Sequence, residues 1–207
     1  MSSRSIYLYG CGGHAKVILD ILKLCQQPIA AFLDDAPPAT QSHIYGVPIL
    51  HSEKLPSIRP DGSLWIVAIG NNAARKQIVE NLSQRGHQFA TAIHPSAQVS
   101  EHVNIGAGTV IMANSVVSVN SFIGQHSIVN TAAAVDHDCQ VGDYVHIAPA
   151  CTLCGGVSIS EGAFLGVGTK VIPYTKVGQW SVCGAGSVVI KPVADHATVY
   201  GVPAIPQ

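Results

Sequence analysis

Hydrophobic residues recur at every sixth position along the second half of the chain. Counted from Ile93, the first residue of each group of six is Ile, Val or Leu in 16 of 17 consecutive groups, and the exception is Cys183. The fifth residue of each group is always small or β-branched. A short fixed period indicates a solenoid in which each coil packs only on its neighbours. The pattern predicts a coil of three strands and three turns that closes after three groups, or 18 residues.

The same period predicts how such a coil is filled. The branched lead residue fills each corner of a triangular core, and only a small fifth residue fits beside it. The second position carries Gly106, Gly124, Gly142 and Gly178 at intervals of 18, with Ser160 in the remaining place. Glycine repeated at one corner indicates a position that a Cβ atom would obstruct.

The first third of the chain has a different hydrophobic pattern. Residues 5–9 form an apolar run that predicts a buried strand, and the run ends in Gly-Cys-Gly-Gly-His-Ala-Lys. Helical spacing follows over residues 15–26, and a second strand is expected over residues 28–33, which lead into Asp34 and Asp35.

The rest of this region continues the alternation of strands and helices. A third strand is expected over residues 65–69, and Asn72 is expected to cap a helix that ends near Arg85. A short strand over residues 88–92 then leads into the repeats. The predicted organisation is an α/β Rossmann-like domain over residues 1–92, a coil of hexapeptide repeats over residues 93–194, and a tail over residues 195–207.

Strand, glycine turn, helix, strand and acid together predict a mononucleotide-binding βαβ unit. Gly10, Gly12 and Ala15 match the GxGxxA spacing, and Asp34 follows after the second strand. Glycines, including Gly13, let backbone N–H groups and a helix N-terminus approach a diphosphate. His14 and Lys16 then place two potential cations beside it. Because only 92 residues precede the repeats, there is no second βαβ half for a dinucleotide such as NAD.

Charge, hydropathy and cysteine content exclude several classes of protein. Charged residues make up 11% of the chain and the net charge is −1, so no basic face for nucleic acid is expected. No apolar run approaches the roughly 18 residues of a membrane span, and the first residues do not continue as a signal peptide, so a cytoplasmic protein is expected. The six cysteines are expected to be free thiols. Cys151 and Cys154 form a CxxC without a second pair, which argues against zinc.

The candidate chemistry of the repeats centres on His137. It occupies a third position, which is not a core position, so its imidazole is expected to point outward between Asp136 and Asp138. A neighbouring carboxylate can fix the imidazole tautomer and raise its basicity, as a general base requires. Residues 18 apart stack at about 4.8 Å, so Gly155 lies one coil from His137 and offers bare backbone with an N–H group.

His146 lies nine residues further, at the far end of a neighbouring face. It cannot easily share a site with His137 within one subunit, but it could do so where the β-helices of two subunits meet. This spacing indicates a site at a subunit interface, as rotational oligomers provide.

These motifs, together with Gly201-Val202-Pro203-Ala204, carry a resemblance over nearly the whole chain. The sequence resembles the bacterial sialic acid O-acetyltransferase and nucleotide-sugar N-acetyltransferase family, and within it the bacillosamine-pathway enzymes that acetylate the 4-amino group of a UDP-linked 4-amino-4,6-dideoxy sugar. The resemblance implies a left-handed parallel β-helix and a homotrimer. It also implies that acetyl-CoA is bound as co-substrate between the β-helices of two subunits. No metal is expected.

The resemblance also implies a role for each candidate residue. His137 would be the base and Asp138 its partner, although the relatives carry Glu at that place. The acetyl-CoA site would be lined by Asn130, His146, Gly155, Val167 and Ala185. The nucleotide sugar would be bound by Gly10, Gly12, Gly13, His14 and Lys16, with Asp34 and Asp35 towards the uridine.

The residues leave other functions open. The acceptor could be the hydroxyl of a free sugar such as sialic acid, or an amino sugar carried on GDP or dTDP. A metal-dependent β-helix enzyme of the carbonic anhydrase kind needs three converging histidines, but the residue five after His137 is Gly142, and His102 has no further partner. A non-catalytic scaffold or sugar-binding module would not need Gly155 stacked on His137.

Overall fold

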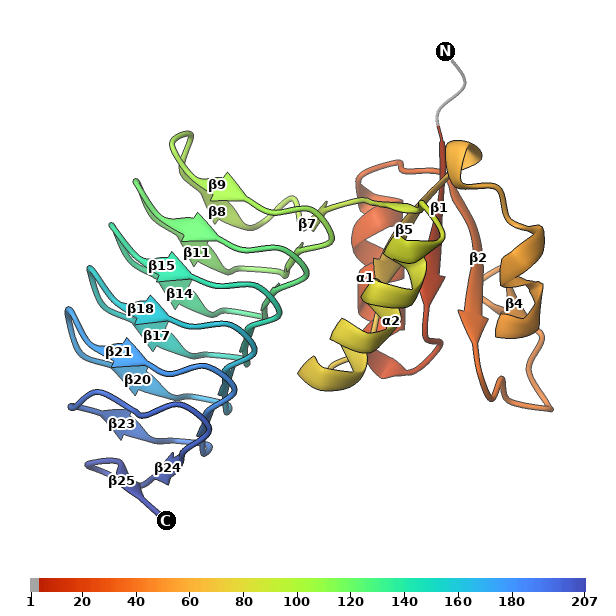
Figure 1. Ribbon diagram of the computed structural model, residues 1–207. Helices are drawn as coiled ribbons and strands as arrows, with labels where there is room; N and C mark the ends of the chain where they lie inside the picture. Colours follow the sequence, from red (N-terminus) through yellow and green to blue (C-terminus); the bar gives the residue numbers. More distant parts are fainter. Residues whose placement is uncertain (1–3) are drawn as a thin grey trace. The chain divides into compact units, whose positions relative to one another are not determined.

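The computed structural model describes residues 4–207, and the chain divides into two compact units, one that ends at Ala92 and one that spans Ile93–Gln207 (Figure 1). The first unit is an α/β domain with a six-stranded sheet in the order β3-β4-β2-β1-β5-β6, parallel except for β3. Its strands are β1 (Ser5–Tyr9), β2 (Ile29–Asp34), β3 (His43–Ile44), β4 (Val47–His51), β5 (Ser63–Val67) and β6 (Gln88–Phe89). Its helices are α1 (Gly13–Leu24), α2 (Asn72–Gln84) and the short 3-10 turns η1 (Ser52–Ser57) and η2 (Pro60–Gly62).

The glycine turn after β1 leads directly into α1. The helix begins at Gly13, two residues before the expected start, and the Gly12 carbonyl accepts the Lys16 N–H at 3.3 Å. The N-terminus of the helix, at Gly13, therefore lies inside the glycine turn. The predicted strand over residues 5–9 is confirmed as β1.

The cap of α2 differs from the prediction. Asn71 is the capping residue, because its backbone is extended and its side chain accepts the Ala74 N–H at 2.9 Å. Asn72, the expected cap, is already helical, and its Oδ1 accepts a hydrogen bond from Arg75 Nη2 at 2.8 Å. Either of the two consecutive asparagines could cap the helix by residue type. The side chain of Asn72 is instead hydrogen-bonded to the buried Arg75 side chain.

The second unit is a left-handed parallel β-helix of three sheets. The first sheet contains β7 (Ala92–Ile93), β10 (Val110–Ile111), β13 (Ile128–Val129), β16 (His146–Ile147), β19 (Phe164–Leu165), β22 (Val182–Cys183), β24 (Thr198–Tyr200) and β25 (Ile205–Pro206). The second sheet contains β8 (Gln98–Val99), β11 (Val116–Val117), β14 (Ala134–Val135), β17 (Thr152–Leu153), β20 (Lys170–Val171) and β23 (Val188–Val189). The third sheet contains β9 (Asn104–Ile105), β12 (Phe122–Ile123), β15 (Gln140–Val141), β18 (Ser158–Ile159) and β21 (Lys176–Val177).

The predicted coil of 18 residues is confirmed by the strand register. Val117 pairs with Val135, and Val135 pairs with Leu153, each one coil apart. Figure 1 shows these coils stacked in chain order from β7 to β24. The residues expected as a tail extend the stack, since β24 pairs with β22 and β25 folds back antiparallel on β24.

The predicted core positions are confirmed for all but the first coil, in which the lead residues Ile93, Val99 and Ile105 are half-buried. Lead residues are buried in every coil from Ile111 to Val189, and fifth residues from Thr109 to Val193. The hydroxyls among the fifth residues are not left unsatisfied. Ser127 Oγ donates to the Gly142 carbonyl at 2.9 Å and accepts the Val145 N–H at 3.0 Å, so it links two consecutive coils inside the core.

Two positions of each repeat have special backbone requirements. At the second position, a Cβ atom on Gly124 would lie 2.4 Å from the backbone carbon of Gly142, so the requirement is space between coils. At the fourth position the backbone is left-handed even where the residue is not glycine, with φ of 56° at Asn114, 60° at Asn120 and 58° at Asp138. Asparagine and aspartate tolerate this conformation better than most residues.

Candidate functional site

His137 lies in the turn that follows β14, at the edge between the second and third sheets. We name the stacked turns over residues 118–121, 136–139, 154–157 and 172–175 the His137 corner. The His137 side chain is 48% exposed, which confirms that its ring points away from the core. Its backbone N–H donates to Asp136 Oδ1 at 2.8 Å, and its carbonyl accepts the Gly156 N–H at 2.9 Å. The turn therefore holds the main chain of this residue on both sides.

Asp138 is the direct partner of the imidazole. His137 Nδ1 lies 2.7 Å from Asp138 Oδ2, so the short side chain of this acid reaches the ring. Hydrogen bonding to Asp138, together with the charge of Asp136, raises the pKa of His137 above its ordinary value. The same bond, with a second one from Asn120, lowers the pKa of Asp138. An ionised Asp138 accepts from Nδ1–H and leaves Nε2 with its lone pair.

The bare backbone predicted beside His137 is present. A Cβ atom on Gly155 would lie 2.5 Å from His137 Cε1 and 2.6 Å from Nε2, so the ring rests directly over this glycine. A Cβ on Gly156 would lie 2.4 Å from Cδ1 of Tyr174, one coil further on. Within residues 4–207 the Gly155 N–H has no hydrogen-bond acceptor. An unused N–H beside a general base can stabilise an oxyanion.

Sequence analysis missed two residues at this corner. Asn120 Nδ2 donates to Asp138 Oδ1 at 3.2 Å, and the Tyr174 ring, on a residue 78% exposed, covers Gly156. The signal was available, because Asn120 precedes Asp138 by 18 residues and Tyr174 follows Gly156 by 18.

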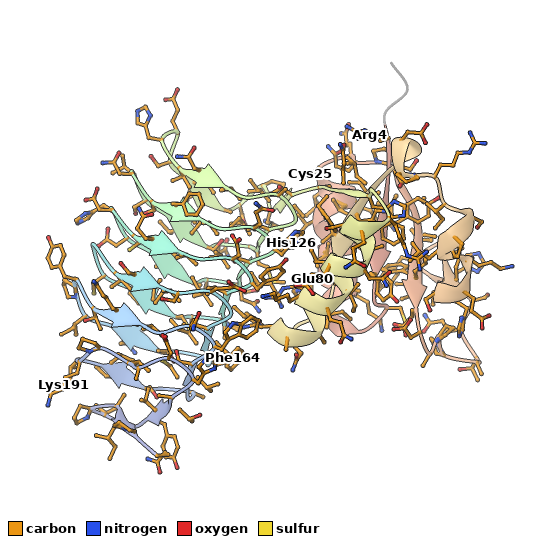
Figure 2. The ribbon with its side chains drawn as sticks, viewed as in Figure 1. Arg4, Cys25, Glu80, His126, Phe164 and Lys191 are labelled. Carbon is orange, nitrogen blue, oxygen red and sulfur yellow. The ribbon has the colours of Figure 1, made fainter. Side chains whose placement is uncertain are left out.

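Asn130, His146, Val167 and Ala185 lie at a different edge of the β-helix. Asn130 begins the turn after β13, and its Nδ2 lies 3.1 Å from Nε2 of His146 in β16. Phe164, labelled in Figure 2, packs edge-on against the His146 ring at 5.3 Å between centroids. We name the turns over residues 130–133, 148–151, 166–169 and 184–187 the Asn130 corner. Val167 and Ala185 are stacked there, because the Gly186 N–H donates to the Val167 carbonyl at 2.8 Å.

The structure therefore divides the predicted acetyl-CoA residues between two corners. His137 and Gly155 share one corner, whereas Val167 and Ala185 share the other. The second sheet lies between the two corners. A ligand that touches both sets needs surfaces from more than one position around the coil.

In the α/β unit, Asp34 holds the glycine turn. Its Oδ2 accepts the Cys11 N–H and its Oδ1 accepts the Ala36 N–H, both at 2.9 Å. Burial acts to raise the pKa of Asp34, but these hydrogen bonds outweigh it and the net pKa is lowered. Burial and the bond to Asp34 raise the pKa of Cys11 to about 11, so this residue is a neutral thiol. Both Asp34 oxygens are thus committed to the turn.

Asp35 has a different environment. Tyr9 donates its hydroxyl to Asp35 Oδ1 at 2.7 Å, and burial followed by this bond raises the pKa of Tyr9 to about 12. Gly10 donates its N–H to the Leu33 carbonyl at 2.7 Å, which joins the glycine turn to the end of β2. The predicted nucleotide-sugar residues Gly12, Gly13, His14 and Lys16 follow at the start of α1. These contacts bring the glycine turn and both acids to the carboxyl ends of β1 and β2, where open α/β sheets bind ligands.

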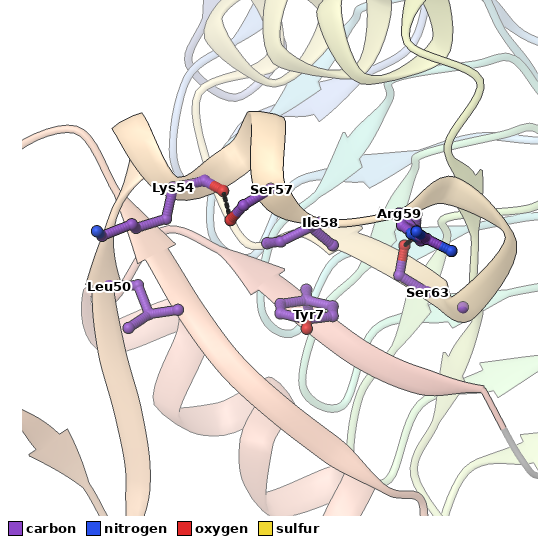
Figure 3. A pocket seen from close by; sticks show the side chains of 8 residues that line it. Tyr7, Leu50, Lys54, Ser57, Ile58, Arg59 and Ser63 are labelled. Atoms are coloured by element: carbon purple, nitrogen blue, oxygen red, sulfur yellow. Dashed lines mark hydrogen bonds between the residues drawn. The ribbon is translucent and has the colours of Figure 1, made fainter.

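Two hollows lie on this unit, and only the first includes a predicted site residue, Lys16. One, of about 430 Å³, is lined by Lys16, Lys23 and Tyr45 along α1. The other, of about 400 Å³, lies over Tyr7 (Figure 3). Figure 3 shows Lys54 and Arg59 at opposite ends of that hollow, so their charges do not converge on one ligand. It contains none of the predicted site residues.

Within residues 4–207, no three His, Cys, Asp or Glu side chains gather in a way that could hold a metal ion. No helix in this range is long and apolar enough to cross a membrane. All six cysteines are free thiols.

Comparisons with known proteins agree with this architecture. Residues 5–82 match the family described as the PglD N-terminal domain. GDP-perosamine N-acetyltransferase from Escherichia coli O157:H7 is 30% identical over 173 residues, which is 79% of this chain and 76% of that protein. UDP-N-acetylbacillosamine N-acetyltransferase from Bacillus subtilis strain 168 is 42% identical over 113 residues, covering 53% of this chain and 52% of that protein.

A solved structure matches both units. A histidine-to-asparagine variant of perosamine N-acetyltransferase from Caulobacter crescentus, in complex with CoA and GDP-perosamine, superposes with a TM-score of 0.93. It is 40% identical, and the match covers 98% of this chain and 96% of that one. The resemblance drawn from the sequence is confirmed: this chain belongs to the family of acetyl-CoA-dependent nucleotide-sugar N-acetyltransferases built on a left-handed β-helix.

Proposed function

We propose that this enzyme transfers the acetyl group of acetyl-CoA to the 4-amino group of a 4-amino-4,6-dideoxy sugar carried on a nucleoside diphosphate, with His137 as general base. The observation that carries the proposal is the His137 ring, which is bonded to Asp138 through Nδ1 and rests on the bare backbone of Gly155. A base, the partner that orients it and an unused N–H group are the parts that acyl transfer requires.

The reaction follows from these parts. The sugar amine attacks the thioester carbonyl, a C–N bond forms, and the oxyanion is stabilised by the Gly155 N–H. Nε2 of His137 takes a proton from the attacking nitrogen. The C–S bond then breaks, and the proton passes to the sulfur so that CoA leaves as a thiol. Much of the rate gain comes from holding two substrates in contact.

The separation of the two corners supports a site shared between subunits. The β-helix of one subunit would contribute His137 and Gly155 to the site. The β-helix of the neighbouring subunit would contribute Asn130, His146, Val167 and Ala185 to the same acetyl-CoA. In a trimer with closed rotational symmetry this interface occurs three times, and at each interface the His137 corner of one subunit faces the Asn130 corner of the next.

The α/β unit supplies the nucleotide-binding part of the proposal. The N-terminus of α1, which begins at Gly13, would face the diphosphate, and Lys16 lies in the first turn of the same helix. Asp34 keeps the turn in place through the Cys11 and Ala36 N–H groups. Asp35 is then the acid that we assign to contact with the nucleobase of the nucleotide sugar.

The nucleotide itself has two candidates. A GDP-linked acceptor is proposed first, because the Caulobacter enzyme, matched over 98% of this chain, binds GDP-perosamine. The UDP-linked acceptor that the sequence favours is supported by the Bacillus relative, which is 42% identical over about half of this chain. A free sugar such as sialic acid lacks the diphosphate that the α1 N-terminus would bind.

The test is release of the CoA thiol with GDP-, UDP- and dTDP-linked 4-amino sugars and with free sialic acid, on wild type and on His137→Ala. We expect one nucleotide-linked amine to exceed sialic acid on the order of 10²-fold or more. His137→Ala should lose roughly 10²- to 10⁴-fold in rate. Its circular dichroism spectrum and native mass should match those of wild type. Wild-type turnover by His137→Ala would refute the assignment of the base.

A further inference from the structure

We propose that Asn120 is a positioning residue for this reaction: its side-chain amide holds the Asp138 carboxylate so that the other carboxylate oxygen faces Nδ1 of His137. The inference rests on the proposed function, in which His137 is the base. It extends the pair of His137 and Asp138 to a chain of three side chains drawn from two consecutive coils.

The fold places Asn120 directly beside Asp138. Both residues occupy the fourth position of their repeats, one coil apart, and both have the left-handed backbone with φ of 60° and 58°. The Asp138 N–H donates to the carbonyl of Val119 at 3.1 Å, so the main chains of the two turns are joined. The side chains therefore leave equivalent positions in adjacent layers, about 4.8 Å apart.

The two oxygens of Asp138 are used on opposite sides. Oδ1 accepts from Asn120 Nδ2 at 3.2 Å, and Oδ2 accepts from His137 Nδ1 at 2.7 Å. The Asp138 side chain is 57% exposed, so core packing does not fix its rotamer. A second anchor limits rotation of the carboxylate, and this keeps the hydrogen bond to the imidazole in place.

An amide suits this position because it donates without adding charge. A lysine there would neutralise the carboxylate and weaken its effect on the imidazole, whereas a second acid would repel it. The charged groups that act on the His137 ring are Asp138 and Asp136, both from its own turn. The adjacent turns contribute Asn120 and Gly155, which are neutral.

A purely conformational role for Asn120 can be separated from this one. Asparagine is favoured in the left-handed region in any case. Asn114 has the same repeat position, with φ of 56°, but lies in another turn away from His137. Replacement of either residue by glycine removes the side chain without backbone strain, since glycine accepts positive φ. Asn114→Gly is therefore the matched control for Asn120→Gly.

The experiment measures kcat/KM against pH for wild type, Asn120→Gly, Asn120→Asp and Asn114→Gly. A base must be unprotonated, so kcat/KM rises with pH through the pKa of His137. Asn120→Gly loosens Asp138, so kcat/KM should fall on the order of 10-fold and the midpoint of the rise should move to lower pH. The KM for acetyl-CoA should not change. Asn120→Asp adds negative charge beside the pair, so its midpoint should move to higher pH.

Opposite shifts in the two Asn120 variants, with an unmoved profile in Asn114→Gly, support the positioning role. Wild-type kcat/KM and midpoint in both Asn120 variants would overturn it, as would an equal shift in Asn114→Gly. His137→Ala separates this failure from that of the proposed function. If His137→Ala is inactive and the Asn120 variants behave as wild type, only the inference about Asn120 is wrong.

Discussion

At the scale of single residues, the position of the imidazole is set by what is missing beneath it. Gly155 provides no side chain, and Asp138 holds Nδ1 at 2.7 Å, so the Cε1–Nε2 edge of His137 lies against the next coil. Gly156 leaves similar room for the Tyr174 ring from the opposite side. The two glycines thus accept one ring from each neighbouring coil, and each ring remains open to solvent on its outer face.

Gly155→Ala tests this directly. The new Cβ would lie 2.5 Å from His137 Cε1, so the ring must move. A displacement of about 1 Å at the reacting group can cost on the order of 10²-fold in rate, and we expect kcat to fall by that order. The rates of wild type, both single variants and the double variant with His137→Ala form a double-mutant cycle. If Gly155→Ala acts through the ring, it should cost little further activity once His137 is Ala. A full additive loss in the double variant would contradict this explanation.

At the scale of elements, each strand of the β-helix has only two or three residues, so stability comes from stacking between coils. Hydroxyls such as Ser127 satisfy backbone groups of the next coil within the core. Glycine at the second position lets one coil approach the next at the corner that contains Gly106, Gly124 and Gly142.

Gly124→Ala should therefore destabilise the β-helix. Its Cβ would meet the backbone carbon of Gly142 at 2.4 Å, and a main chain cannot move aside as a flexible side chain could. Overpacking of this kind costs about 1–3 kcal/mol, which thermal unfolding followed by circular dichroism would detect. Ser160→Ala is the matched control, because Ser160 occupies the same repeat position and already carries a Cβ. An equal loss of stability in both variants would show that space at this corner is not limiting.

The accuracy of the sequence-based predictions also varies with the element. The six-residue period is local and is maintained over 102 residues, so it predicted the register, the core and the contact between His137 and Gly155. The left-handed fourth position was not recognised, because residues as different as Asn120, His126 and Ala132 occupy it. In the α/β unit, adjacent asparagines made the cap of α2 ambiguous. The partners of Asp34 depend on a loop that no period describes.

At the scale of the whole molecule, the proposed acetyl-CoA site draws on two corners of the β-helix. His137 and the stacked Val167 and Ala185 lie on either side of the second sheet. In the homotrimer proposed above, each subunit would therefore contribute a different half to two different sites. In such an assembly two different inactive variants can form an active site together, because each chain still carries the corner that is damaged in the other. A site built within one chain does not allow this.

We therefore predict complementation between His137→Ala and Val167→Glu. Val167 is 54% exposed, so the acid should be tolerated in the fold while it repels the anionic co-substrate. When the two chains assemble at random into trimers, about one interface in four should pair an intact His137 with an intact Val167. When they are co-expressed with different tags and purified through both, only mixed trimers remain, and about one interface in three should do so, which gives about a third of wild-type activity per site. Each variant alone should have the native mass of wild type and little activity. Mixed trimers as inactive as the parent variants would mean that the His137 corner and the Asn130 corner do not meet across a subunit boundary.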